Sequence, residues 1–415
     1  MFERVRERVR REYSHFDNLG DDLKRLLFSY GLLLMAWPMI VTFVNAYLWQ
    51  YGEGPNRLIF YNLMFFLGLP AGFWLNTLFL EKVHVLKLYA AGAVVQGISA
   101  FLVILYPAIN IPTLSLYGLF FGVGSGLYWA NKNYLTLRLS RGRNRMYYNN
   151  IEYSMDLLVY TIVPVVVGWL LVLGEVWGIY VKESAYKYML FVAQILLMLS
   201  GYIIQRVKIA DFRVKRVLLR DNNPEWNWVR LYNVGSNVLT GLHFFLPGVL
   251  VLYLVGEEGI FGTVESVACL LSAIVMYVVG RKVNLDRSWK MVAIGSLVVF
   301  AGTLTLSFWY GVVGVLANLV LMTIGRSLIW TSSYSQTMEL MDQGKGAEMP
   351  ERQYAYVFDN ELFFNVGRVM GVGILLYMIY VGGINFALRY IFLLAAALQV
   401  FMIWPQYMIS KHLRK

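Results

Sequence analysis

Long apolar segments alternate with short polar ones from residue 26 to residue 408. A transmembrane helix needs about 20 mostly apolar residues, and twelve segments meet that requirement. They are residues 26–49, 58–79, 86–107, 113–136, 152–174, 187–206, 228–253, 259–280, 289–309, 312–337, 356–380 and 386–408. The pattern predicts an all-α integral membrane protein with twelve transmembrane helices. An even number of crossings places both chain ends on one side.

The composition supports a membrane protein and disfavours several kinds of site. Of the 415 residues, 58% are hydrophobic and the mean hydropathy is +0.55, whereas soluble domains are nearer one half apolar. A single cysteine, Cys269, excludes an intramolecular disulfide and a multi-cysteine metal or iron–sulfur centre. Four scattered histidines leave little for zinc or haem. We therefore expect no cofactor and no metal.

Basic residues are distributed unevenly between the two predicted faces. Of the 36 Lys and Arg, 29 fall at the chain ends or in the loops on their side. The opposite face holds only Arg57, Lys182, Lys187 and Arg389. The positive-inside rule places the basic face in the cytoplasm. The net charge of +11 thus reports topology, and we expect the cytoplasmic (inner) membrane and no nucleic-acid partner.

The first 25 residues form a basic arm. Its apolar residues recur every three or four positions among arginines, a pattern typical of a helix lying on an anionic membrane surface. They are Phe2, Val5, Val9, Tyr13 and Phe16. The arm lacks the apolar core and the cleavage site of a signal peptide. A solvated arm that only fixes orientation is the alternative, and membrane lipids are the partner that the first interpretation implies.

Three short stretches of the first half recur in the second half, in the same order. GSGLYWAN from Gly124 matches GRSLIWTS from Gly325 at an offset of 201. LKLYAAG from Leu86 matches WKMVAIG from Trp289, and RMYYNNIE from Arg145 matches RQYAYVFD from Arg352, at offsets of 203 and 207. A nearly constant offset indicates a parallel internal repeat. The basic, polar segment 207–226 lies between the two copies.

Twelve helices with both ends inside, a 6+6 repeat and a basic central linker resemble the major facilitator superfamily over nearly the whole chain. The glycine, acid and arginine signature of that family is missing from GFWLNTLFLEKVHVLK at Gly72, and GRKVNLDRSWK at Gly280 keeps a closer remnant. The chain thus resembles a divergent prokaryotic-type branch. The resemblance implies alternating access around a central cavity between two six-helix bundles. The predicted parts are the arm 1–25, the bundles 26–206 and 228–408, the linker 207–227 and the tail 409–415.

Two arginines lie deep in the second half. Arg326 is about 21 Å along its helix and Arg368 about 18 Å, so both fall near the membrane midplane. A guanidinium binds carboxylate or phosphate through two parallel hydrogen bonds, which makes both candidates for binding an anionic substrate. The alternative is a fixed ion pair with Asp359, Glu361 or Glu265.

Lys132 lies in an apolar, glycine-rich stretch near the cytoplasmic end of its helix. We expect it to pair across the bundles with Asp359 or Glu361 and so to act as a gate. The alternatives are a lysine that reaches the membrane surface and a pair inside the first bundle with Glu152 or Asp156.

Proton coupling needs a carboxylate that gains and loses a proton as its surroundings change. Glu152, Asp156, Asp359 and Glu361 are the candidates. Carboxylates that only cap helix ends are the alternative. Uniport or exchange needs no titrating group.

Further polar and aromatic residues could complete a pocket. They are Asn45, Asn237, His243, Trp129 and Trp330. Asn237 and His243 belong to a polar stripe with Asn233, Ser236 and Thr240. The two tryptophans are candidates for stacking on a substrate, with packing between helices as the alternative. Pro38, Pro164 and Pro247 are expected to loosen their helices.

The sequence lacks a P-loop GxxxxGK[ST] and any convincing nucleophile–base arrangement, so we expect no enzyme. The preferred function is secondary active transport of a small organic solute, anionic or amphiphilic, with protons as the expected coupling ion, by a monomer. The alternatives are a multidrug or amphiphile exporter, and a non-transporting sensor, assembly factor or lipid scramblase. A cavity bordered by both halves would favour transport, whereas arginines sealed in a dry interior would favour a non-transporting protein.

Overall fold

Helices account for nearly all of the structure. The computed structural model describes residues 16–17, 19–51, 55–105, 110–140, 142–209, 219, 224–256, 258–280, 288–344, 346 and 349–413, and it contains no strand in these residues. Nine helical segments of this part are long and apolar enough to cross a membrane. The prediction of an all-α, multi-pass membrane protein is confirmed. Most of the basic arm and of the central linker falls outside the described residues.

The helices of the first half cover its six predicted spans. They are α2 (Asp21–Tyr51), α3 (Pro55–Phe79), α4 (Val85–Leu105), α5 (Ile111–Leu139), α6 (Gly142–Val176) and α7 (Lys182–Ile204). Both α2 and α6 continue through their internal prolines, Pro38 and Pro164.

The second half is more broken. Its helices are α8 (Trp226–His243), α9 (Leu246–Leu254), α10 (Glu258–Gly280), α11 (Ser288–Phe308), α12 (Val312–Asp342), α13 (Pro350–Phe401) and α14 (Ile403–His412). The predicted span 228–253 is interrupted between α8 and α9. Pro247 lies just after this break, where its missing N–H cannot bond the carbonyl of His243.

The 52-residue α13 combines two predicted spans. Gly383 lies between them with φ of 77°, a left-handed conformation that glycine adopts without steric cost. The backbone is not helical at this point, so 356–380 and 386–408 are separate helical stretches on either side of Gly383.

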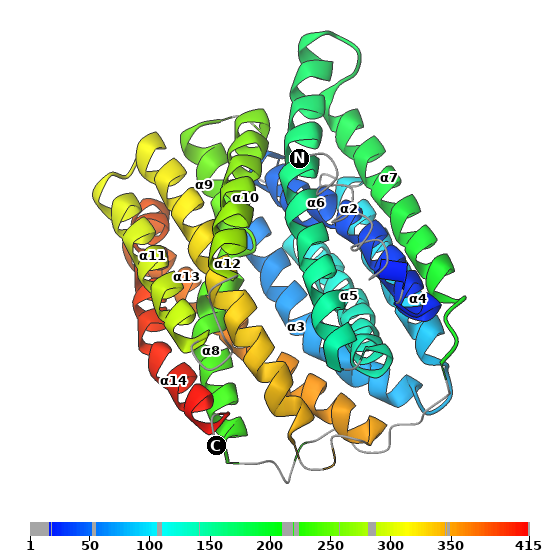
Figure 1. Ribbon diagram of the computed structural model, residues 1–415. Helices are drawn as coiled ribbons and strands as arrows, with labels where there is room; N and C mark the ends of the chain where they lie inside the picture. Colours follow the sequence, from blue (N-terminus) through cyan, green and yellow to red (C-terminus); the bar gives the residue numbers. More distant parts are fainter. Residues whose placement is uncertain are drawn as a thin grey trace, which may run out of the picture.

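Most helix packing occurs within each half of the chain. Helices α2–α7 lie on one side of the molecule and α8–α14 on the other (Figure 1). In the first half α5 packs on α3 and α4, while α7 packs on α2 and α4; in the second half α11 packs on α12 and α8 packs on α13. A Cβ on Gly122 of α5 would lie 2.2 Å from the Phe65 carbonyl oxygen of α3. Glycine therefore permits the close contact of α3 with α5.

Several helix pairs join the halves, chiefly α6 with α10 and α3 with α13, and to a lesser extent α5 with α13 and α2 with α9. At the first pair, the Trp169 indole N–H donates to Thr263 Oγ1 at 2.9 Å. A Cβ on Gly262 would lie 2.2 Å from the Pro164 carbonyl oxygen. The halves are thus in direct backbone contact along α6 and α10.

Candidate solute-binding site

A small cavity lies inside the second half, between α8, α12 and α13. Its lining side chains are Tyr232, Asn233, Ser236, Asn237, Leu239, Thr240, Arg326, Ile329, Trp330, Ser333, Tyr334, Thr337, Phe364 and Gln399. Helix α8 contributes the polar stripe that the sequence indicates, because positions three and four apart share one helix face. Of the predicted substrate-binding residues, Arg326, Trp330 and Asn237 meet here.

Arg326 lines the cavity without an acidic partner. Its Nη1 is hydrogen-bonded to Nδ1 of His243, at the end of α8. Arginine only donates hydrogen bonds, so His243 Nδ1 accepts and the ring hydrogen resides on Nε2. His243 Nε2 is buried and has no partner among the described residues. Within the same part of the chain, no carboxylate forms an ion pair with Arg326.

Arg368 is paired instead, as the alternative interpretation has it. Its Nη1 donates to Glu361 Oε1 at 2.9 Å and to Asn365 Oδ1 at 3.2 Å. Arg368 does not line the cavity, but it is near enough to Arg326 to interact with it electrostatically. Glu361 thus compensates Arg368, and the nearby Arg326 guanidinium leaves the region with an excess positive charge.

Aromatic rings form one wall of the cavity. Trp330 stacks on Tyr334 with ring centroids 5.2 Å apart and an interplanar angle of 11°. Phe364 of α13 lies 6.0 Å from Trp330. Trp330 is 40% exposed, so these neighbours leave part of its ring free.

Lys132 pairs inside the first half, and the expected pair with Asp359 or Glu361 is not formed. Lys132 Nζ lies 2.6 Å from Glu152 Oε1. The ammonium also lies 4.4 Å from the Tyr30 ring centroid, a cation–π contact. The expectation failed because both acids have nearer cations in the second half. In this structure Lys132 is therefore a buried, compensated charge rather than a link between the halves.

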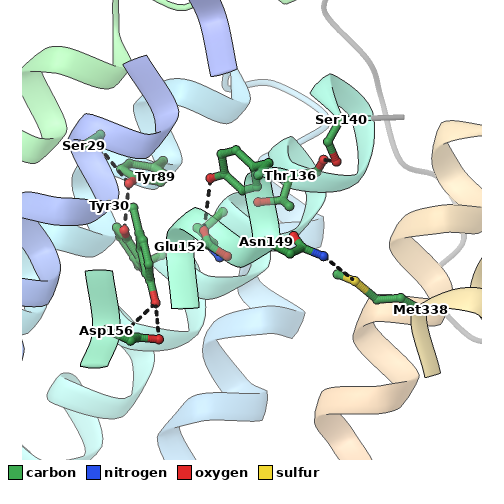
Figure 2. Close-up of polar contacts among 12 residues, drawn as sticks. Ser29, Tyr30, Tyr89, Thr136, Ser140, Asn149, Glu152, Asp156 and Met338 are labelled. Carbon is green, nitrogen blue, oxygen red and sulfur yellow. Dashed lines mark hydrogen bonds and ion pairs between the residues drawn. The ribbon is translucent and has the colours of Figure 1, made fainter. Parts of the chain in front are cut away.

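Glu152 and Asp156 lie one turn apart on α6, as Figure 2 shows. The Tyr148 hydroxyl donates to Glu152 Oε1 at 3.0 Å. The Tyr30 hydroxyl approaches both oxygens of Asp156 at 3.4 Å (Figure 2). Asp156 forms no ion pair with any basic side chain that the structure describes. Of the predicted proton-coupling residues, it alone has a carboxylate without a paired cation.

Asp359 is held by Arg230 and Trp226 of α8. Arg230 Nη2 donates to Asp359 Oδ1 at 2.6 Å and Nε donates to Oδ2 at 2.8 Å, a bidentate pair. The Trp226 indole N–H adds a bond of 2.7 Å to Oδ2. Arg230 is not among the predicted site residues, because only the packing of α8 on α13 brings it to Asp359.

Two further predicted residues lie away from the cavity. Trp129 of α5 packs edge-on against Tyr30 and Trp37 in the first half. Asn45 Nδ2 donates to the Val41 carbonyl at 2.7 Å, and Asn45 Oδ1 accepts from Asn62 at 2.8 Å. Neither side chain is left free for a solute at this site.

The cavity is lined by second-half residues alone, so the expected sharing between the halves is not observed here. The halves instead contact each other along α3. Phe244 stacks on Phe65 with ring centroids 4.9 Å apart, and Tyr354 of α13 is wholly buried where α3 ends. The Tyr354 hydroxyl donates to the Phe73 carbonyl at 3.2 Å and accepts from Asn76 Nδ2 at 3.0 Å.

The Asn76 side chain that donates to Tyr354 also belongs to a pair of buried amides. Asn76 and Asn131, the neighbour of Lys132, exchange two hydrogen bonds of 3.1 and 2.7 Å. Sequence reasoning missed this cluster because its residues are neutral, although Tyr354 appears in the repeat match at Arg352.

No group of His, Cys, Asp and Glu in the described part of the chain could hold a metal ion.

Comparisons with known proteins agree with this fold. No family model matches the chain. It is 24% identical over 344 residues to the uncharacterized protein YqgE of Bacillus subtilis (strain 168), which covers 82% of this chain and 79% of that protein. The crystal structure of the nucleoside transporter NupG matches 94% of this chain and 99% of its own, with a TM-score of 0.64 and 12% identity. The chain therefore shares the overall fold of this transporter.

Proposed function

We propose that this protein is a secondary active transporter that moves a small organic anion across the cytoplasmic membrane by alternating access. The observation that supports it most is the Arg326 guanidinium, which lines a cavity and has no acidic partner in the part of the chain that the structure describes. A charge inside a membrane protein is costly unless it is paired or faces a cavity. An anionic solute would supply the missing charge through charge-assisted hydrogen bonds.

The proposal includes the predicted topology. Twelve spans, in bundles 26–206 and 228–408 with both chain ends in the cytoplasm, agree with the biased distribution of basic loops. Counting α8 with α9 as one span, and α13 as two spans divided at Gly383, gives six spans in the second bundle. Alternating access would then open Tyr354 and its α3 partners on the cytoplasmic side, and Phe244 with its α3 partners toward the other side.

The substrate proposed here differs in charge from that named for the structural neighbour. NupG is titled a nucleoside transporter, and a nucleoside is uncharged at neutral pH. In this chain the excess positive charge around Arg326 and Arg368 favours an anion. Import and export are equally compatible with the site.

Proton coupling would use Asp156. Among the described residues, the Asp156 carboxylate accepts a hydrogen bond from Tyr30 alone and forms no ion pair, unlike Glu152, Asp359 and Glu361. A carboxylate without a paired cation can change its protonation without breaking an ion pair. Asp156→Asn should therefore remove the response of transport to a pH gradient while leaving solute exchange in place.

Flux in proteoliposomes tests the proposal. We expect uptake of at least one labelled acid from orotate, benzoate, lactate and citrate, and loss of that uptake in Arg326→Gln. Arg389→Gln is the control, since Arg389 bonds the Ser307 carbonyl outside the cavity. Wild-type uptake by Arg326→Gln would remove the substrate role of Arg326.

One observation favours a second candidate, a non-transporting solute sensor on the same fold. The cavity is lined by the second half alone, so a ligand could occupy it without contacting the first half. Saturable binding of an acid with no flux in either direction would identify such a sensor.

A further inference from the structure

Two amide side chains that line the cavity each have a buried oxygen without a hydrogen-bond donor of standard geometry among the described residues. Asn237 is 3% exposed, and its Nδ2 donates to the Asn233 carbonyl at 2.9 Å. Because a carbonyl can only accept, the Asn237 amide cannot be flipped, and its free atom is the acceptor Oδ1.

Gln399 shows the same feature on the neighbouring helix. The Ser296 hydroxyl donates to the Val292 carbonyl at 2.7 Å, so its oxygen accepts from Gln399 Nε2 at 3.2 Å. The Gln399 amide is therefore also fixed, and its buried Oε1 accepts no hydrogen bond of standard geometry from the described residues, although the Tyr232 hydroxyl of the same cavity lies close to this amide. Buried acceptors without partners are rare in native structures, and two that line one cavity indicate a ligand that donates.

We propose that this cavity binds a planar, ring-bearing organic anion that carries N–H or O–H groups on its ring. The anionic group pairs with Arg326, the ring donors bond Asn237 Oδ1 and Gln399 Oε1, and the ring packs on the Trp330 and Phe364 wall. The inference rests on the proposed function in taking the cavity as the solute site.

Other solute classes leave part of the site unsatisfied. A neutral nucleoside supplies a ring and donors but leaves the Arg326 charge uncompensated. An aliphatic acid without donors pairs with Arg326 but leaves both amide oxygens unbonded. A cation is repelled by the excess charge of Arg326 and Arg368. The proposed class alone satisfies the charge, the two acceptors and the aromatic wall.

Four probes separate these requirements in calorimetric titrations of the purified, full-length protein. Orotate combines a planar ring, a carboxylate and ring N–H groups; uracil lacks the carboxylate, benzoate lacks the donors, and cyclohexanecarboxylate lacks both planarity and donors. We expect orotate to bind most tightly, benzoate about hundredfold more weakly and cyclohexanecarboxylate more weakly still, with uracil also at least hundredfold weaker than orotate. These ratios correspond to the loss of two hydrogen bonds for benzoate and of a charged one for uracil.

A variant tests the role of the amide directly. Gln399→Met keeps the length of the side chain and removes the acceptor. We expect the preference for orotate over benzoate to fall about tenfold while benzoate affinity stays within twofold. Retained benzoate binding shows that the variant is folded. Gln194→Met, in α7 of the first half and outside the cavity, is the matched control and should leave the preference unchanged.

The possible results separate this inference from the proposed function. Uracil binding as tightly as orotate, benzoate binding as tightly as orotate, or equal affinity for benzoate and cyclohexanecarboxylate would overturn the ligand class. So would flux of lactate or citrate without binding of any ring acid, although transport itself would then stand. Orotate binding in the expected order without flux would uphold the ligand class and reject transport. Neither binding nor flux with any probe would overturn both.

Discussion

Helices α5 and α12 are related by the repeat offset of 201, yet they treat their buried cations differently. Lys132 of α5 corresponds to Ser333, and Arg326 of α12 corresponds to Ser125. Lys132 Nζ lies 2.6 Å from Glu152 Oε1, whereas Arg326 is hydrogen-bonded to His243, lines a cavity and has no acidic partner among the described residues. A cation neutralised within its own half is not available to a ligand, whereas a cation without a counter-charge can bind one. Lys132 and Arg326 thus differ in their partners as well as in their depth.

The largest expected effect is the loss of stability when the ion pair of Lys132 with Glu152 is broken. Glu152→Gln leaves the Lys132 ammonium buried without a counter-charge, which should lower the free energy of unfolding by about 3 kcal/mol. Thermal unfolding in detergent measures the change. The double variant Lys132→Met with Glu152→Gln removes both charges and should recover most of the loss. A single variant as stable as the wild type would show that the pair contributes little.

The corresponding change at Arg326 should affect ligand affinity rather than stability. Arg326→Gln breaks no ion pair, so its stability should stay within about 1 kcal/mol of wild type or rise. Its affinity for an anionic probe such as orotate should fall about hundredfold, because a charge-assisted bidentate contact is lost. Arg326→Lys keeps the charge without the planar fork and should show an intermediate loss. Calorimetric titration of both variants distinguishes charge from geometry; strong destabilisation in Arg326→Gln would indicate an acidic partner.

Much of the fold follows from sequence because it depends on local patterns. Apolar length alone predicts the helices, and Pro247 marks the end of α8 through its missing N–H. Gly383 could have been recognised as the break in α13 only from its position between two spans, since its positive φ depends on how the two stretches pack. The number of spans and the side of each terminus stay predictions.

The site was harder to predict because its chemistry depends on pairing across distant segments. Helical periodicity placed Asn237 and its neighbours on one face, and depth singled out Arg326. The ion-pair partners could not be predicted in this way. Arg230 lies 129 residues from Asp359 in the sequence, and its bond occupies one of the two acids that Lys132 was expected to bind. Gln399 was missed because a single glutamine in an apolar helix carries no periodic signal.

A smaller effect should follow from loosening the contact between Tyr354 in the second half and α3 in the first half. Tyr354→Phe removes the hydroxyl that bonds Asn76 and the Phe73 carbonyl. One or two lost hydrogen bonds should favour opening at this end about tenfold. Hydrogen–deuterium exchange of the first turns of α13 measures that opening. Tyr61→Phe removes a buried hydroxyl without a partner in the described structure and should leave exchange unchanged; equal exchange in all three proteins would contradict a closing role for Tyr354.

The smallest expected effect concerns Asn45, an amide whose oxygen and nitrogen are both hydrogen-bonded, in contrast to Asn237. Asn45 in the first half has its oxygen bonded by Asn62 and its nitrogen bonded to Val41, whereas Asn237 in the second half keeps a free oxygen in the cavity. Asn45→Ala should therefore lower the free energy of unfolding by about 1 kcal/mol through the lost hydrogen bonds, and leave orotate affinity within twofold. Unfolding and titration on the same preparation measure both quantities. A tenfold loss of affinity in Asn45→Ala would mean that the first half contributes to the solute site in a conformation other than this one, and that the division between a folding half and a binding half holds for one state of the transport cycle only.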